Sequence, residues 1–223
     1  MIYTVPKDWK GQTCVILAGG PSLRKMDLLS VFVAKPKVRV ITINDSWRLA
    51  PRADALFFTD AQWWHYQTAK NLRTVYGSQS FHELIYQGFW VSSARAFEDH
   101  PQVHYLHLTG QRGLETNPEG LRHGSNSGYA AINLAYLYGA TKIILLGYDM
   151  KVSGMRTHWH DEPRPAGFGQ VLEQTMLPNF DSLVSPLEEA GVEVINATPD
   201  SALTCWKYLP LEEALSIPVS QGV

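Results

Sequence analysis

Short apolar runs recur along the chain, and each ends in small or polar residues. Five are well defined, at residues 13–17, 38–43, 55–59, 142–146 and 193–196. The runs TCVIL (13–17) and KIILL (142–146) are apolar almost throughout, which is typical of parallel strands that are covered on both faces of a sheet. Weaker strand candidates lie at residues 89–92 and 103–108.

Helical patterns alternate with these runs. They cover residues 22–33, 60–74, 127–138, 177–190 and 211–215. The strongest is SGYAAINLAYLY (127–138), where small and apolar residues dominate and Gly139 provides a stop signal. The alternation predicts one α/β domain over residues 1–223, built on a doubly wound, mostly parallel Rossmann-like sheet.

Two stretches interrupt this rhythm. Residues 151–175 are rich in glycine and proline and contain two histidines, so they predict a long lid-like insertion. Residues 111–126 form a second irregular stretch.

Small and hydrogen-bonding residues follow the predicted strands. In open α/β sheets, ligands bind beyond the carboxyl ends of the strands, so these residues together predict a binding site. They are Gly19-Gly20-Pro21-Ser22, Asn44-Asp45, Asp60, Gly147-Tyr148-Asp149 and Asn196-Ala197-Thr198.

The turn from Gly19 to Ser22 has the form strand, glycine turn, helix. In that arrangement, backbone N–H groups and the helix dipole favour an anion such as phosphate. Pro21 suits a first helical position, because its missing N–H leaves no donor unpaired there. The stretch matches neither the dinucleotide fingerprint nor the P-loop, so a tight turn without a ligand is the alternative.

Three further sets of residues suit either a structural role, as helix caps, or a role in ligand binding. Asn44 and Asp45 suit either a helix cap or contacts to a ribose or base. Ser125, Asn126, Ser127 and Gly128 open the strongest helix, where Ser125 or Ser127 suits a cap and the same groups suit phosphate or ribose. Asp60, ahead of Trp63 and Trp64, either caps a helix or holds a polar ligand beside an aromatic wall.

His158 and His160 lie in the predicted insertion, beside Asp161 and Glu162. Imidazole exchanges protons near neutral pH, so either histidine suits a general base. A second interpretation is that the two histidines bind a metal together with one of the neighbouring carboxylates. A third is that they are surface histidines without a direct role. The sequence leaves all three open.

The composition of the chain argues against several classes of protein. The net charge of −2 gives no overall attraction to nucleic acid. Cys14 and Cys205 lie far apart and no CxxC pair is present, which argues against a zinc ribbon. No apolar run reaches the roughly 20 residues that span a bilayer, and the N-terminus has no apolar signal core. We therefore expect a cytoplasmic protein.

Several motifs together resemble one superfamily. These are VILAGGPSL, ITIND, FTD, SNSGYAAINLAYLYGATKIILLGYDM and NATPDSAL, which occur in this order over most of the chain. They are similar to motifs of the motility-associated-factor flagellin glycosyltransferases and the archaeal-type hydroxymethylpterin diphosphokinases. The bacterial sialyltransferases of glycosyltransferase family 42 resemble the chain more distantly. GYDM followed by HWH looks most like small, stand-alone phage-encoded members, for which the host cytoplasm is the expected location.

The resemblance implies a Rossmann-like fold that binds an activated nucleotide, such as a CMP-sugar. By similarity to the sialyltransferases, Gly20, Pro21, Ser22 and Asn44 match nucleotide-contacting positions, and Ser127-Gly128 matches their helix start. His158 or His160 is the nearest counterpart of their general base. The interpretation is a glycosyltransferase whose donor is a nucleotide-sugar, with no tightly bound cofactor, no metal and an unknown acceptor.

Two other functions remain open at this stage. A diphosphokinase-like enzyme would use a nucleoside triphosphate with Mg²⁺ near Asp60, Asp149 or Asp161. A non-catalytic nucleotide-binding protein, such as a phage accessory protein, would keep the fold with an altered pocket. The sequence does not indicate nucleic acid as a partner, and it leaves open a homo-oligomer.

Overall fold

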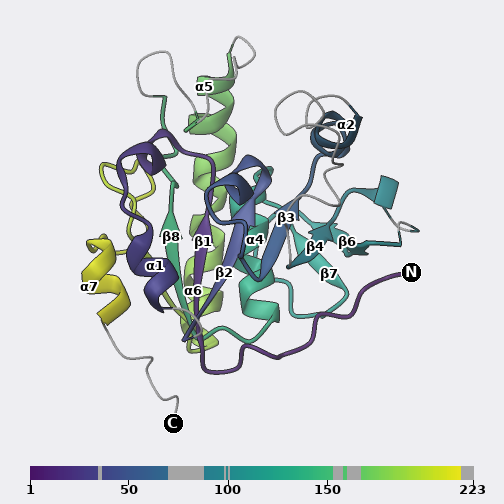
Figure 1. Ribbon diagram of the computed structural model, residues 1–223, viewed down its shortest axis with the longest axis horizontal. Coiled ribbons are helices and arrows are strands. Elements are labelled where there is room, and N and C mark those ends of the chain that lie inside the picture. The colour runs from purple at the N-terminus through teal and green to yellow at the C-terminus, as the bar shows by residue number, and fades with distance from the viewer. Residues whose placement is uncertain are drawn as a thin grey trace.

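The computed structural model describes residues 1–34, 37–69, 88–97, 99, 101–152, 158–159 and 167–216. Seven strands of this part form one parallel sheet with the order β5-β4-β3-β2-β1-β8-β9 (Figure 1). The strands are β1 Thr13–Leu17, β2 Val38–Ile43, β3 Ala55–Phe58, β4 Phe89–Ser92, β5 Val103–Tyr105, β8 Lys142–Leu146 and β9 Glu193–Asn196. The predicted α/β class and the Rossmann-like, doubly wound parallel sheet are confirmed.

The chain order changes direction between β1 and β8. From β1 the chain adds β2 to β5 on one side, and it later returns to place β8 and β9 on the other side. Thr13 pairs with Val38 on one neighbour and with Lys142 on the other, so β1 and β8 end level with each other. This reversal is a topological switch point, where ligands of doubly wound sheets bind.

Helices cover both faces of the sheet (Figure 1). One apolar cluster joins the sheet to α4 and α6, and a second joins its other face to α1 and α7. A small parallel sheet of β6 and β7 lies beside the main one. The remaining elements are α1 Leu29–Ala34, α2 Ala61–Ala69, β6 His107–Gly110, β7 Gly120–Arg122, α4 Ser127–Leu137, α5 Phe168–Val171, α6 Asp181–Glu189 and α7 Leu211–Ser216.

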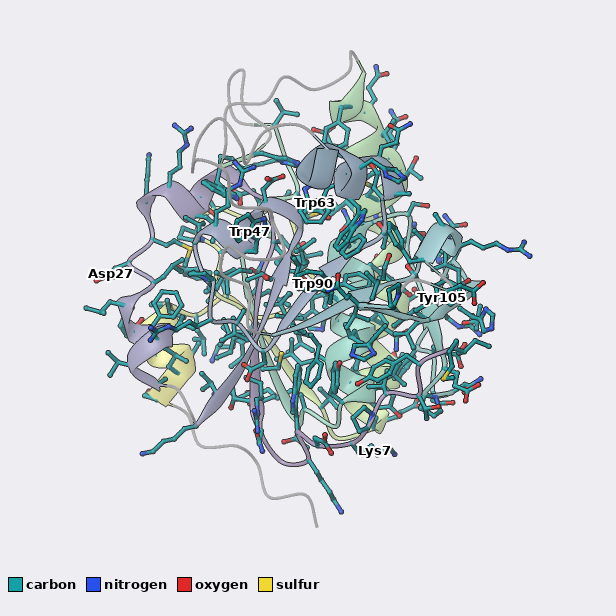
Figure 2. The ribbon with its side chains drawn as sticks, turned by 45° about the vertical axis from the view of Figure 1, so that its right-hand side comes forward. Lys7, Asp27, Trp47, Trp63, Trp90 and Tyr105 are labelled. Carbon is teal, nitrogen blue, oxygen red and sulfur yellow. The ribbon has the colours of Figure 1, made fainter. Side chains whose placement is uncertain are left out.

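Burial explains the apolar pattern of the central strands. Every residue of β1 and of β8 is buried, because helices lie on both faces. A third cluster, rich in aromatic residues, packs near β3 and β4 and includes Trp47, Trp64 and Trp90. Figure 2 labels Trp47 and Trp90 of this cluster. Trp64 stacks on Phe58 with ring centroids 5.1 Å apart. Trp64 is therefore a core residue, not part of a ligand wall.

The structure differs from the predicted pattern in three places. The helix expected over residues 22–33 is a 3₁₀-helix, Pro21–Lys25, followed by α1, because Asp27 accepts a hydrogen bond from the Leu29 N–H and starts a new helix. The run 103–108 divides into β5 and β6. The end of the expected lid, from Phe168 onward, is helical and includes a π-helical turn, Leu172–Met176.

No helix in the described part of the chain is long and apolar enough to cross a membrane.

Candidate functional site

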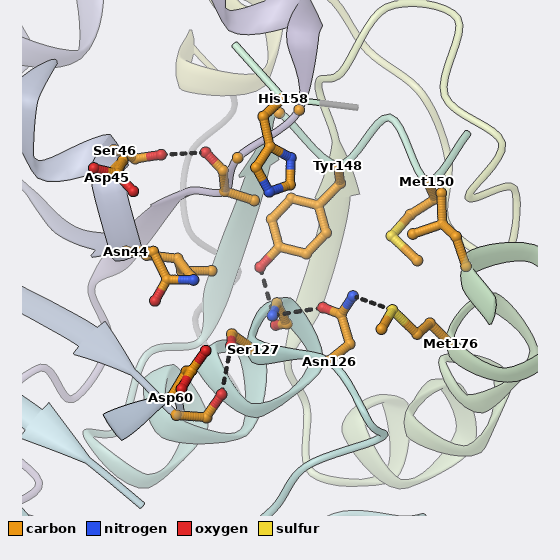
Figure 3. Close-up of a pocket in the computed structure, with 18 of the residues that line it drawn as sticks. Asn44, Asp45, Ser46, Asp60, Asn126, Ser127, Tyr148, Met150, His158 and Met176 are labelled. Carbon is orange, nitrogen blue, oxygen red and sulfur yellow. Dashed lines mark hydrogen bonds between the residues drawn. The ribbon is translucent and has the colours of Figure 1, made fainter. Parts of the chain in front are cut away.

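A pocket of about 950 Å³ opens at the carboxyl ends of the strands, where the chain order reverses (Figure 3). It collects residues that are far apart in sequence, because the parallel strands all end at this edge. The predicted site residues that line it are Gly19, Gly20, Asn44, Asp45, Asp60, Ser125, Asn126, Ser127, Gly128, Asp149 and His158. Pro21 and Ser22 lie just behind the lining, and His160 falls outside the described residues.

The glycine turn after β1 is not the phosphate cradle that the sequence predicts. The Gly20 N–H donates to the Gly147 carbonyl at 2.8 Å, and the Ser22 N–H donates to Asp149 Oδ1 at 3.0 Å. Pro21 has no N–H. The turn is therefore tied to the end of β8, and of its amides only that of Gly19 shows no acceptor among the described residues.

Asp149 holds this turn in place. Its Oδ2 accepts a hydrogen bond from the Ser22 hydroxyl at 2.7 Å, and its side chain is almost fully buried. Burial raises the pKa of Asp149 above its ordinary value, although the Ser22 hydrogen bonds and the charge of Lys151 oppose the shift. Asp149 therefore holds the wall of the pocket together.

Replacing Asp149 by asparagine is expected to change how stability depends on pH. The native carboxyl holds its proton to a higher pH than the unfolded group, whose pKa is 3.8, so its stabilising contribution is complete below pH 3.8 and is lost as pH rises through the native pKa. Asp149→Asn stays neutral and keeps an oxygen for the Ser22 N–H. Its melting temperature relative to the natural protein should therefore rise with pH. Thermal unfolding of both proteins from pH 3.8 to neutrality checks this, and a difference that is constant or falls with pH contradicts it.

Asn44 carries two costly features at the end of β2. Its φ is 50°, a left-handed conformation that few non-glycine residues adopt, and its Oδ1 is buried with no hydrogen-bond partner among the described residues. An unpaired buried acceptor costs about 1–3 kcal/mol. Asn44 lines the pocket, so a ligand that supplies the missing donor would remove this cost.

Asp45 has a supporting role next to Asn44. Its Oδ2 accepts a hydrogen bond from Trp63 Nε1 at 2.9 Å, and its Oδ1 forms an ion pair with Arg48 at 2.8 Å. The buried carboxylate thus fixes the Trp63 ring at the pocket wall. Asp60 is exposed and accepts a hydrogen bond from the Gln62 N–H at 2.7 Å, so it starts α2 while also lining the pocket.

The start of α4 is capped by Asn126, not by Ser125 or Ser127. Asn126 Oδ1 accepts hydrogen bonds from the N–H groups of Gly128 at 2.6 Å and Tyr129 at 3.3 Å. The Ser127 hydroxyl pairs with that of Thr59 at 2.7 Å, which joins α4 to the end of β3. The amide of Gly128, which the sequence suggested for phosphate, is therefore already paired within the protein.

His158 is the predicted base that the structure places in the pocket. A methyl group added at Gly19 would meet its imidazole at 3.6 Å, so the ring lies directly over the bare glycine. The Trp159 N–H donates to the Gly19 carbonyl at 2.9 Å, which joins the two segments. Asp161 and Glu162 fall outside the described residues, and the described part of the chain contains no cluster of three or more residues that could bind a metal.

The structure adds pocket residues that the sequence did not single out. They lie within or beside the quoted motifs and the predicted insertion, and none was named as a site candidate: Ser46, Thr59, His123, Met150, Lys151, Leu172 and Met176. Asn196 and Thr198, by contrast, bind the backbone of Leu203 and Leu145 and do not line the pocket.

Comparison with known proteins agrees with this architecture. No protein-family model matches the chain, and no curated protein matches it either. Its structure is similar to that of the sialyltransferase CstII from Campylobacter jejuni in complex with the substrate analogue CMP-3FNeuAc, with a TM-score of 0.53, 14% identity, and coverage of 89% of this chain and 86% of that chain. It is also similar to the MAf glycosyltransferase from Magnetospirillum magneticum AMB-1, with a TM-score of 0.60 and 14% identity, over 99% of this chain but only 37% of that chain. The chain therefore shares its fold with these two proteins.

Proposed function

We propose that the protein is a glycosyltransferase that uses a nucleotide-activated sugar as its donor. The observation that carries the proposal is Asn44, strained and with an unpaired buried oxygen, in a pocket at the sheet's switch point. Strain of this kind costs about 1–3 kcal/mol and concentrates at functional sites. The fold shared with two glycosyltransferases supports the reaction class, and the CMP-sugar analogue bound to one of them supports the donor class.

The polar side of the pocket suits the nucleoside of the donor. Asn44 and Asp60 offer amide and carboxylate groups to ribose hydroxyls or a base edge. The indole of Trp63, held by Asp45, gives a flat apolar surface on which a base would stack.

His158 suits the general base of the transfer. It would accept the proton of the acceptor hydroxyl while that oxygen forms a bond to the anomeric carbon. The bond from this carbon to the donor phosphate breaks at the same time, and the nucleotide leaves with the electron pair. The imidazole lies beside Gly19 in the turn after β1, where a methyl group on Gly19 would make an ordinary contact with it at 3.6 Å. His160 remains the alternative base that the sequence names.

A melting-temperature screen with nucleosides, nucleotides and nucleotide-sugars tests the proposal. A ligand that binds the native state raises the melting temperature by mass action, and mass spectrometry of retained ligands would identify one directly. Hydrolysis or transfer of a bound nucleotide-sugar should then follow. Turnover that requires a nucleoside triphosphate and stops with a chelator would favour the diphosphokinase instead. Absence of any nucleotide binding would favour the non-catalytic alternative.

Replacing Asn44 by glycine is expected to stabilise the protein and weaken nucleotide binding. Glycine adopts the φ of 50° without strain and removes the unpaired buried oxygen. The gain is reduced by the larger entropy of glycine in the unfolded chain, which leaves roughly 1 kcal/mol. Thermal unfolding and titration with the nucleotide found in the screen check both effects. A variant that is destabilised and binds normally would show that Asn44 has only a structural role.

A further inference from the structure

The backbone of the pocket offers few N–H groups to a phosphate. Gly20 and Ser22 donate to the end of β8, and Gly128 and Tyr129 donate to Asn126. In these two turns, Gly19 and Ser127 are the residues whose N–H groups show no acceptor among the described residues. Phosphate oxygens accept several hydrogen bonds, so side chains must supply the remaining donors.

The charges around the pocket make such donors more necessary. Asp45, Asp60 and Asp149 all line it, and the two of them that are buried, Asp45 and Asp149, already use both oxygens within the protein. An anionic ligand next to carboxylates needs compensation from positive or hydrogen-donating groups. Lys151 supplies a charge near Asp149. Among the described lining residues, His123 and His158 are the other side chains that can carry a positive charge, and each also has ring N–H groups that can donate a hydrogen bond.

His123 is held in one orientation at the wall of the pocket. Its Nδ1 accepts a hydrogen bond from the Ser125 N–H at 3.0 Å, so the neutral ring carries its proton on Nε2. Hydrogen bonds fix the surrounding loop: the His123 N–H donates to the Gly110 carbonyl at 3.2 Å, and the His123 carbonyl accepts from the Asn126 N–H at 2.7 Å. Gly124 admits no side chain, because a methyl group there would lie 2.3 Å from the Tyr129 ring.

We propose that His123 binds the phosphate of the donor nucleotide through its Nε2–H. The inference rests on the proposed function, since it assigns a ligand for the phosphate within the same pocket. Nε2 has no hydrogen-bond partner among the described residues, and His123 lines the pocket. Its loop is held by the backbone hydrogen bonds of His123 and by the close approach of Gly124 to the buried Tyr129. His123 thereby supplies a hydrogen-bond donor in place of the backbone N–H groups of the glycine turn and of the start of α4, which are already hydrogen-bonded within the protein.

Two substitutions of His123 distinguish the role of Nδ1 as an acceptor from the role of Nε2 as a donor. His123→Asn keeps an acceptor close to the position of Nδ1 for the Ser125 N–H and removes the Nε2 donor. His123→Gln does the reverse, because its amide N–H₂ reaches close to the position of Nε2 while the local acceptor is lost. The measured quantity is the ratio of the Kd of a nucleoside to that of its 5′-monophosphate, for the base identified by the melting screen.

His123→Asn is expected to weaken binding of the 5′-monophosphate about tenfold, which corresponds to the loss of one good hydrogen bond to a charged group, and to leave nucleoside binding unchanged. His123→Gln should keep most of the preference for the phosphate. If His123→Asn retains the preference, or if it weakens both ligands equally, the role of Nε2 is overturned while the nucleotide site stands. If the natural protein binds neither ligand, the proposed function fails and this inference fails with it.

Discussion

Gly20→Ala is expected to destabilise the protein by at least about 3 kcal/mol, the upper range of overpacking in a rigid site. A methyl group at this position would lie 1.8 Å from Asp149 Oδ2 and 2.5 Å from the Gly147 carbonyl oxygen. The carbonyl belongs to the backbone at the end of β8, and the carboxylate is held by two hydrogen bonds from Ser22, so neither neighbour moves cheaply. For a chain of this size, the melting temperature should fall by roughly 6 °C or more.

Gly19→Ala is the matched control, because the two glycines are adjacent in the same turn. Its methyl group would make only an ordinary contact at 3.6 Å with the His158 ring, so stability should change by less than about 1 kcal/mol. Thermal unfolding of the two variants side by side measures the difference. If both variants unfold at the same temperature, the tight junction between the ends of β1 and β8 does not exist as described.

The contrast between these glycines shows what the sequence does and does not reveal. The motif AGGPSL correctly marks a turn at the edge of the sheet, because glycine and proline are local signals. The direction in which its amides point depends on Asp149, 127 residues further along the chain. No local pattern contains that contact, and so a turn that resembles a phosphate cradle is paired internally instead.

Strands were predicted more accurately than helices for a related reason. Burial on both faces produces continuous apolar runs such as TCVIL and KIILL, and those runs match β1 and β8 in full. The helical pattern over residues 22–33 is broken where the Asp27 carboxylate accepts one hydrogen bond from the Leu29 N–H. Aspartate is also common on the polar face of a helix, so the sequence does not mark this break. Similarly, Asn126 rather than either neighbouring serine caps α4, because its side chain reaches two amides at once.

The predicted residues lie together in one pocket mainly because of the strand order of the sheet, and not because of any single motif. Once the parallel order is correct, every strand end lies at the same edge, and β1 and β8 place their turns together. Topology alone does not define the reaction, since one fold hosts many activities. Asn44, His123 and His158 make the functional proposal testable. Asn44 has a buried oxygen, and His123 an imidazole nitrogen, with no hydrogen-bond partner among the described residues, while His158 lies in the pocket against the glycine turn.

His158→Ala is expected to lower the turnover number between about 10²-fold and 10⁴-fold, the usual contribution of a general base. The affinity for the donor should stay within about twofold, since the imidazole would act on the acceptor hydroxyl rather than on the nucleotide. The position of the ring over Gly19, beside the edge of Phe168 with centroids 6.5 Å apart, places it within the pocket and next to the turn that ends β1. Steady-state kinetics and donor titration on the same preparation separate the two quantities.

His107→Ala provides the control, because His107 lies on β6 outside the pocket and should leave turnover unchanged. Added imidazole should restore part of the activity of His158→Ala, since it supplies the missing base in the space that the side chain leaves. Equal losses of turnover and donor affinity would instead show that His158 binds the donor. Full turnover in His158→Ala, with loss in His160→Ala, would assign the base to His160 and leave His158 as part of the pocket wall.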